Sequence, residues 1–97
     1  MKKPGAELRA FDALVSGRVQ GVGFRYSACR EAQALGLSGW IRNTDDGEVE
    51  VHAEGERSSL DSFAAWLHEG PPGAFVTSVD ISPCLPSGRF KGFGVDF

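Results

Sequence analysis

Residues 38–54 read SGWIRNTDDGEVEVHAE, in which a tight-turn sequence separates two short segments. The Asp46-Gly47 pair is a strong hairpin signal, because glycine supplies the positive φ that a tight turn requires. After the turn, apolar and polar residues alternate over positions 48–54. Such alternation indicates an antiparallel strand with one face on a core and the other in water. The stretch therefore predicts a β-hairpin with strands at 38–43 and 48–54.

The sequence before the hairpin predicts a strand, a loop and a helix. Apolar residues at every second position predict a strand that Gly17 ends. Good helix formers, with apolar residues at helical spacing, predict a helix that Gly36 ends. The residues between them hold two glycines and fit neither regular element. These elements are a strand at 8–16, a loop at 18–24 and a helix at 26–35.

The sequence after the hairpin predicts a second helix and two more strands. Apolar residues recur at i, i+3, i+4 and i+7 over positions 60–67, and either Ser58 or Ser59 can cap the helix. The run at 70–72, Gly-Pro-Pro, ends it, because proline cannot continue the helical hydrogen-bond ladder. The strands that follow are at 75–82 and 93–97.

The predicted element order is β-α-β-β-α-β with an additional terminal strand. Helices that cover one face of an antiparallel sheet form a two-layer structure with a single core between the layers. The fold class is therefore α+β, a ferredoxin-like two-layer sandwich with an antiparallel sheet and two helices on one face.

The composition fits one small folded domain. The chain has 97 residues, of which 41% are hydrophobic, and this is enough for one core and argues against intrinsic disorder. We expect a single domain at residues 8–97, preceded by a flexible lead-in at residues 1–7. The net charge of −3 argues against a general binder of nucleic acid or anionic membranes. It is compatible with a small anionic substrate, because one well-placed arginine can hold a phosphate.

Nothing in the sequence indicates export or membrane insertion. The first residues lack the apolar run of a signal peptide, and no stretch approaches the roughly 20 apolar residues of a membrane span. The sequence has two cysteines, Cys29 and Cys84, which is too few for a disulfide scaffold or a four-thiolate zinc site. Their spacing does not support a bridge between them. We expect a cytoplasmic protein, and a monomer because no long apolar stripe is left once the core is assigned.

The loop between the first strand and the first helix lies in GRVQGVGFR, residues 17–25. Its glycines let backbone N–H groups converge, and the start of the following helix attracts anions. Arg25 adds a planar fork that fits phosphate oxygens bidentately. The loop can therefore bind a phosphate, although it lacks the Gly-Lys-Ser/Thr ending of a nucleotide-binding loop. The alternative, from spacing alone, is an ordinary glycine-containing turn with a solvated arginine.

A second candidate lies in GWIRNTDDG, residues 39–47. Asn43 ends a predicted strand, and its neutral amide can accept a hydrogen bond from water while it donates one to an oxyanion. Taken alone, Asn43 can equally be a residue that favours the hairpin turn.

Together, these two stretches resemble the paired signatures of the acylphosphatase family. Residues 17–25 match its G-x-V-Q-G-V-x-F-R pattern throughout, and residues 39–55 match its glycine, aromatic, basic residue and asparagine, followed by spaced glycine and valine positions. Ile41 is slightly larger than the residue usual there. The ending at 93–97, FGVDF, resembles the family's closing strand, with phenylalanine where tyrosine is usual. The likeness runs from about residue 8 to residue 97.

The resemblance implies an enzyme that hydrolyses the carboxyl–phosphate anhydride of acyl phosphates to a carboxylate and inorganic phosphate. Arg25 and the loop N–H groups would hold the phosphoryl oxygens, and Asn43 would orient the attacking water. The carboxylate leaving group, with a pKa near ~4, departs without a general acid. We expect no cofactor, and no metal because no ligand cluster has suitable spacing near these stretches. The loop residues implied in phosphate binding are Gln20, Gly21, Val22, Gly23 and Phe24.

The remaining chemically versatile residues have structural explanations. His52 alternates with glutamates on a strand, which predicts a solvated side chain. His68 lies near the end of the second helix, where it can complement the helix dipole. Cys29 occupies an apolar helical position and is predicted to be a small core residue. No role can be assigned to Cys84.

Two rival functions share this fold. An RNA-recognition motif has the same element order, and residues 91–97, KGFGVDF, superficially resemble its aromatic strand. However, this copy is one residue short, it lies at the C-terminus rather than on the third strand, and the chain is acidic. A phosphate-sensing module without catalysis is the second rival. The favoured partners are a small acyl phosphate and inorganic phosphate, with no nucleic acid and no membrane.

Overall fold

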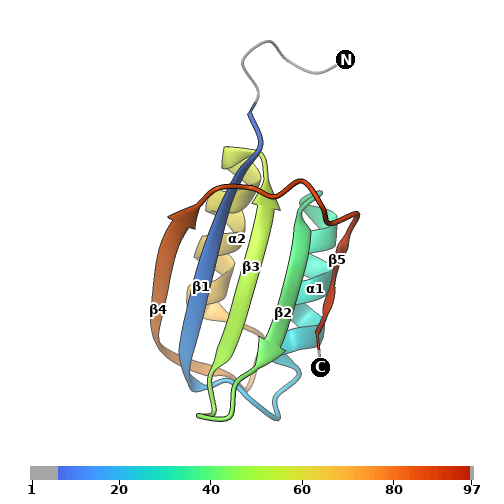
Figure 1. The fold of residues 1–97 in the computed structure, drawn as a ribbon. Helices are drawn as coiled ribbons and strands as arrows, with labels where there is room; N and C mark the ends of the chain where they lie inside the picture. The colour runs from blue at the N-terminus through green and yellow to red at the C-terminus, as the bar shows by residue number, and fades with distance from the viewer. Residues whose placement is uncertain (1–6, 97) are drawn as a thin grey trace.

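A computed structural model describes residues 7–96. It consists of one five-stranded sheet with both helices on one face (Figure 1). The strand order across the sheet is β4-β1-β3-β2-β5. This confirms the α+β sandwich predicted from the sequence. The elements are β1 (Arg9–Arg18), α1 (Phe24–Ala34), β2 (Ser38–Asn43), β3 (Val49–Gly55), α2 (Arg57–Glu69), β4 (Phe75–Cys84) and β5 (Phe93–Val95).

The terminal strand makes the sheet mixed rather than wholly antiparallel. Strands β1, β2, β3 and β4 pair antiparallel, as expected, whereas β5 pairs with β2 in parallel. The physical reason is the path of residues 85–92. This segment leaves the end of β4, crosses the open face of the sheet without changing ends, and reaches the opposite edge (Figure 1). A strand that starts from this end must run opposite to β4, and β2 also runs opposite to β4.

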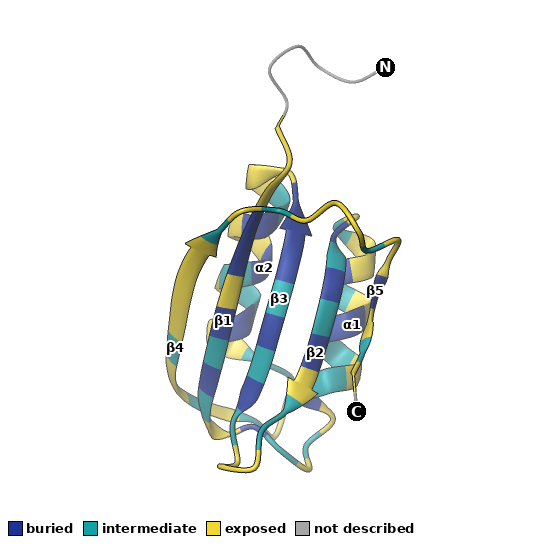
Figure 2. Cartoon of the chain, in the orientation of Figure 1, coloured by how far each residue is buried: buried dark blue, intermediate teal, exposed yellow. Residues whose placement is uncertain are grey.

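The core lies between the sheet and the helices, and the predicted alternation places its residues. Phe11, Ala13 and Val15 of β1 are buried, as the period-two pattern predicts, and Figure 2 shows buried bands alternating with more exposed ones along β1. Phe63 of α2 is fully buried at the centre of this core. Its ring lies 6.4 Å from that of Phe11 on β1 and 5.6 Å from that of Phe93 on β5. Helix α2 therefore contacts strands from both halves of the sheet. Aromatic pairs at such distances add stability beyond their buried area.

Strand β1 continues two residues beyond the predicted end. Gly17 does not end the strand, because the pairing with β4 shifts register between Ser16 and Gly17 and then resumes. Gly17 has φ +123°, and a Cβ there would lie 2.1 Å from the carbonyl oxygen of Phe75. Glycine is required at this bulge both by its backbone angle and by the close approach of β4.

Both helices begin earlier than predicted. Helix α1 starts at Phe24 rather than Tyr26, because Gly23 in the left-handed conformation (φ +76°) turns the chain directly into the helix. Helix α2 starts at Arg57, so Ser58 and Ser59 lie inside its first turn and the predicted serine cap is wrong. Glu56 holds the N-cap position without a side-chain hydrogen bond to the helix.

The predicted lead-in at residues 1–7 lies outside the described residues, apart from Glu7, which is exposed. Residue 97, the end of the predicted last strand, also lies outside them. Among residues 7–96, no helix has the length and apolar character needed to cross a membrane.

Candidate functional site

The glycine loop and the hairpin turn meet at one end of the sheet. Strands β1 and β2 both end there, and α1 begins there (Figure 1). The side-chain amide of Gln20 joins the two segments, because its Nε2 donates to the carbonyl oxygens of Thr44 at 2.9 Å and Glu48 at 2.8 Å. The loop is therefore attached to the residue that follows Asn43.

The hairpin turn is held by its own hydrogen bonds. The backbone N–H of Thr44 donates to the carbonyl of Glu48 at 2.9 Å, and the N–H of Glu48 donates to Oγ1 of Thr44 at 3.1 Å. Gly47, with φ +87°, completes the turn. Oγ of Ser16 on β1 donates to the carboxylate of Glu48 at 2.8 Å. These contacts hold the hairpin turn together and fix it against the end of β1.

The loop backbone depends on two glycines for its angles rather than for space. Gly21 and Gly23 have φ +75° and +76°, and a Cβ at either position would meet no atom of the described residues within 4 Å. Phe24, the first residue of α1, is buried and its ring lies 5.4 Å from that of Trp66 on α2. The start of α1 is thereby anchored, and no side chain among residues 7–96 caps it. Uncapped N–H groups at a helix start form a favourable site for an anion.

Arg25 is the second residue of α1 and is half-buried. Its backbone therefore lies at the same end of the molecule as the loop and Asn43. A guanidinium this close to a helix start adds its charge to that of the helix dipole.

Asn43 is the last residue of β2 and pairs with Val49 of β3. Val49 is fully buried and therefore points to the face of the sheet that carries the helices. Asn43 is its direct partner and points to the same face. Oδ1 of Asn43 is buried and accepts no hydrogen bond from any residue in the described range 7–96. A buried acceptor without a donor costs about 1–3 kcal/mol, so this oxygen calls for a partner such as a bound water.

The predicted site residues thus come together at one end of the sheet, although Asn43 lies 18 residues beyond Arg25 in the sequence. Gln20 was expected to contribute only its backbone N–H, and its side-chain bridge was missed. A glutamine in a loop offers no sequence signal for such a bridge, because the partner carbonyls are brought near only by the sheet pairing.

The prediction that His52 is solvated is wrong. Its side chain is only 13% exposed, and its ring lies between those of Trp40, at 6.0 Å, and Phe90, at 5.5 Å. Nδ1 lies 2.7 Å from a carboxylate oxygen of Asp12, and Nε2 lies 2.7 Å from one of Glu54. Burial lowers the pKa of His52, but these two hydrogen bonds outweigh it and raise the pKa above its ordinary value.

Glu54 also departs from the expected wet face, because residues 85–92 cover it. It is 1% exposed and accepts hydrogen bonds from the backbone of Ser87 and Gly88 and from the hydroxyl of Ser87. Burial raises the pKa of Glu54, but the hydrogen bonds from His52, Ser87 and Gly88 outweigh it and lower the pKa to about 2. Glu54 therefore holds the crossing segment as a carboxylate.

The other predictions for single residues agree with the structure. Cys29 is buried in the core, and both cysteines are free thiols. His68 is exposed in the last turn of α2, where Nδ1 lies 2.9 Å from the carbonyl oxygen of Ala64. Phe93 is 5% exposed and packs on Phe63, so it cannot stack on a base as the RNA-binding alternative requires.

Known proteins of similar sequence and similar fold belong to one family. The sequence profile of the acylphosphatase family matches residues 11–95. The acylphosphatase of Methylococcus capsulatus is 48% identical over 88 residues, which cover 91% of this chain and 96% of that protein. The acylphosphatase of Thermococcus kodakarensis is 46% identical over 95 residues, 98% of each chain. The crystal structure of acylphosphatase from Bacillus subtilis has a TM-score of 0.88 at 37% identity and covers 94% of this chain and 100% of its own. This chain therefore belongs to the acylphosphatase family and is an enzyme of that family.

Proposed function

We propose that this enzyme hydrolyses the carboxyl–phosphate anhydride bond of acyl phosphates, with Arg25 and the loop of residues 20–24 binding the phosphoryl group and Asn43 orienting the water. The observation that carries the assignment of roles is the buried, unpartnered Oδ1 of Asn43, within the described residues, beside the loop that Gln20 attaches to the same turn. Family membership supports the reaction class.

Phosphate binding relies on backbone donors and one guanidinium. The loop N–H groups and the uncapped start of α1 donate hydrogen bonds to the phosphoryl oxygens, and Arg25 binds two of them with its planar fork. These donors are oriented before the substrate arrives. They therefore stabilise the charge that spreads over the phosphoryl oxygens in the transition state without further reorganisation.

Asn43 acts on the nucleophile. Its Oδ1 accepts a hydrogen bond from a water molecule, which satisfies the buried acceptor and directs a lone pair of the water at phosphorus. The bond from water oxygen to phosphorus forms as the bond from phosphorus to the acyl oxygen breaks. The carboxylate leaves with the bonding electron pair, and the water proton passes to the phosphate product.

The reaction needs no general acid, because a carboxylate with a pKa near ~4 is a stable leaving group at neutral pH. Positioning and charge stabilisation then supply most of the acceleration of a loose phosphoryl transfer. A phosphate monoester, whose alkoxide leaves poorly, is therefore a poor substrate. Because the site holds the phosphoryl end, it discriminates weakly among small acyl groups. We propose that the enzyme acts as a monomer.

The test compares a synthetic aryl acyl phosphate with an aryl phosphate monoester at equal concentration in the presence of chelator. The expected result is rapid release of phosphate from the acyl phosphate and little from the monoester. A rate with the acyl phosphate no higher than the uncatalysed rate, from folded protein, would show that this chain is a phosphate-binding module without catalysis.

A further inference from the structure

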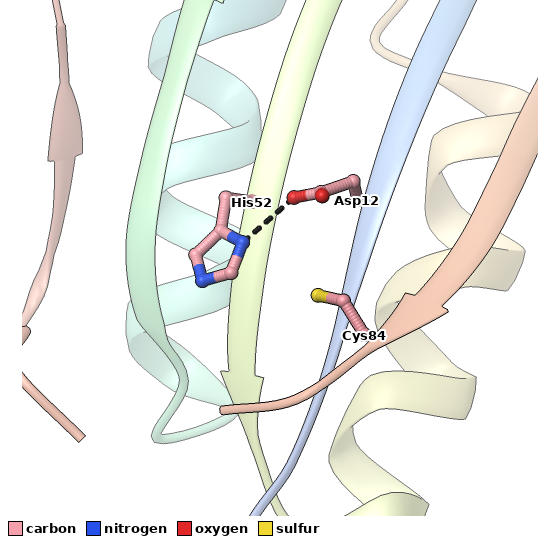
Figure 3. Close-up of side chains that lie close together, drawn as sticks. All are labelled: Asp12, His52 and Cys84. Carbon is pink, nitrogen blue, oxygen red and sulfur yellow. Dashed lines mark hydrogen bonds and ion pairs between the residues drawn. The ribbon is translucent and has the colours of Figure 1, made fainter. Parts of the chain in front are cut away.

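We propose that Asp12, His52 and Cys84 form a binding site for a divalent transition-metal ion of the zinc type. Figure 3 shows the three side chains pointing toward one another from β1, β3 and the end of β4. One ligand atom from each lies within 4.8 Å of the others, namely a carboxylate oxygen, a ring nitrogen and the sulfur. The sheet register brings them together, because Asp12 pairs with His52 on one side and with Ser82, two residues before Cys84, on the other.

The donor set suits zinc. Thiolate, imidazole and carboxylate are its three usual protein ligands, at about 2.0–2.3 Å from the ion. In a tetrahedral site such ligands lie about 3.5 Å apart, since this separation follows from those bond lengths. The sulfur must therefore move inward by about 1 Å, and the 2.7 Å contact between Asp12 and His52 must widen by a similar amount. Cys84 is the last residue of β4 and Asp12 is exposed, so this adjustment falls on side chains that lie outside the core. Water completes the fourth position.

His52 is already oriented for coordination through Nδ1. Its Nε2 lies 2.7 Å from Glu54, whose carboxylate is held in turn by Ser87 and Gly88. A carboxylate on the outer nitrogen of a metal-bound histidine fixes the ring and directs the other nitrogen at the metal. The rings of Trp40 and Phe90 limit rotation of the imidazole. Glu54 is thus a positioning residue of the proposed site.

Binding exchanges protons for the metal. The ion forms bonds to the sulfur of Cys84 and to Nδ1 of His52 and displaces the thiol proton and the Nδ1 proton to solvent. A thiolate and a neutral imidazole are the ligand forms that zinc requires. The charge of the cluster is then unchanged, because two protons leave as one divalent ion enters.

The proposed metal site is separate from the site of Asn43. His52 lies three residues along β3 from Val49, the partner of Asn43, which corresponds to about 10 Å of strand. Odd spacing also places the two side chains on opposite faces of the sheet. The ion would bridge β1, β3 and the residue from which the crossing segment departs. Its expected effect is on stability and not on turnover.

The chain offers matched controls. One of its two histidines and one of its two cysteines belong to the cluster, and the other histidine and the other cysteine lie outside it. Full-length protein, reduced with a phosphine, is titrated with Zn²⁺ by calorimetry and with Co²⁺ by absorption spectroscopy. The expected result is one ion per chain, a cobalt–thiolate charge-transfer band, and a melting temperature that rises with Zn²⁺ and falls back with chelator.

The variants Cys84→Ala and Asp12→Asn leave the pair of His52 and Glu54 intact. Loss of a residue that only hydrogen-bonds a metal ligand weakens metal binding by about 10–100-fold, so loss of a ligand itself is expected to weaken Zn²⁺ binding by at least this factor. Cys84→Ala also abolishes the cobalt–thiolate band. His68→Gln and Cys29→Ala are expected to keep full affinity, and the exposed His68 supplies the control if loss of the core thiol unfolds the chain. The proposal is overturned if wild-type protein binds no Zn²⁺ at millimolar concentration, if Cys84→Ala keeps its affinity and band, or if His68→Gln loses affinity as Cys84→Ala does.

Discussion

The side chain of Gln20 donates a hydrogen bond to the carbonyl oxygen of Thr44 at 2.9 Å, across 24 residues of sequence. Thr44 follows Asn43 directly, so this contact sets the position of the glycine loop relative to the proposed water-orienting amide. The same Nε2 bonds to Glu48 on the other side of the turn. One side chain thus connects the two halves of the proposed site without taking part in the reaction.

Gln20→Ala is expected to lower turnover by about 10-fold or more, because small displacements of reacting groups cost up to about 10²-fold. The loss of stability should be only about 1 kcal/mol, since the carbonyls of Thr44 and Glu48 each keep a backbone donor. The control is Gln33→Ala, which removes a similar bond, 3.0 Å long, to the carbonyl of Phe93 from the last turn of α1, at the opposite end of that helix from the loop. Kinetics and melting curves are measured for both. Equal turnover in the two variants would contradict the positioning role.

Arg25→Ala is expected to weaken phosphate and substrate binding together with turnover, because the proposed contact of the guanidinium with the phosphoryl group is made in both the ground state and the transition state. Arg30→Ala, an exposed arginine one and a half turns further along α1, is the matched control and should keep both. Phosphate affinity is measured by calorimetry and turnover with an aryl acyl phosphate. Unchanged phosphate affinity in Arg25→Ala would remove Arg25 from the binding site.

Asn43→Ala is expected to reduce turnover roughly 10²–10³-fold while phosphate affinity stays nearly unchanged. The reason is that, in the proposed mechanism, the amide contacts the water and not the phosphoryl oxygens. Stability should change little, because the substitution also removes a buried acceptor that has no donor among the described residues. The same calorimetry, kinetics and melting curves test this. A folded Asn43→Ala protein with full activity would show that the water is oriented by another group.

Inorganic phosphate is expected to inhibit competitively and to stabilise the fold, because the proposed loop site exists only in the native state. At a hundredfold excess over its dissociation constant, the free energy of unfolding should rise by about 2.7 kcal/mol. Melting curves in phosphate are compared with curves in chloride at equal ionic strength. The rise should disappear in Arg25→Ala, and an equal shift in that variant would indicate binding elsewhere.

Chelator is expected to leave turnover unchanged. The metal-type ligands grouped within residues 7–96 are Asp12, His52 and Cys84, which lie on the face of the sheet away from Asn43. Kinetics before and after exhaustive treatment with chelator test this, with melting curves in parallel to report any loss of Zn²⁺. A loss of turnover that a divalent ion restores would show that the hydrolysis depends on a metal.

Much of this protein is determined by local sequence. The period-two pattern of β1, the Asp-Gly turn and the helical spacing around Phe63 each act over a few residues, and the structure agrees with all three. The glycines of the loop also follow from local geometry, since positive φ angles favour glycine whatever surrounds it. The proposed loop and Asn43 could therefore be found from the sequence alone.

The tertiary structure decided what depends on which strands become neighbours. Sheet pairing placed His52 between Asp12 and Glu54, and the crossing segment buried Glu54 under Ser87, although strand alternation predicts that both side chains face water. The return of the chain at one end made β5 parallel to β2. The physical reason is the range of the forces involved. Backbone angles and side-chain alternation are properties of adjacent residues, whereas a hydrogen bond between Gln20 and Thr44 exists only after the sheet has brought distant segments within 3 Å.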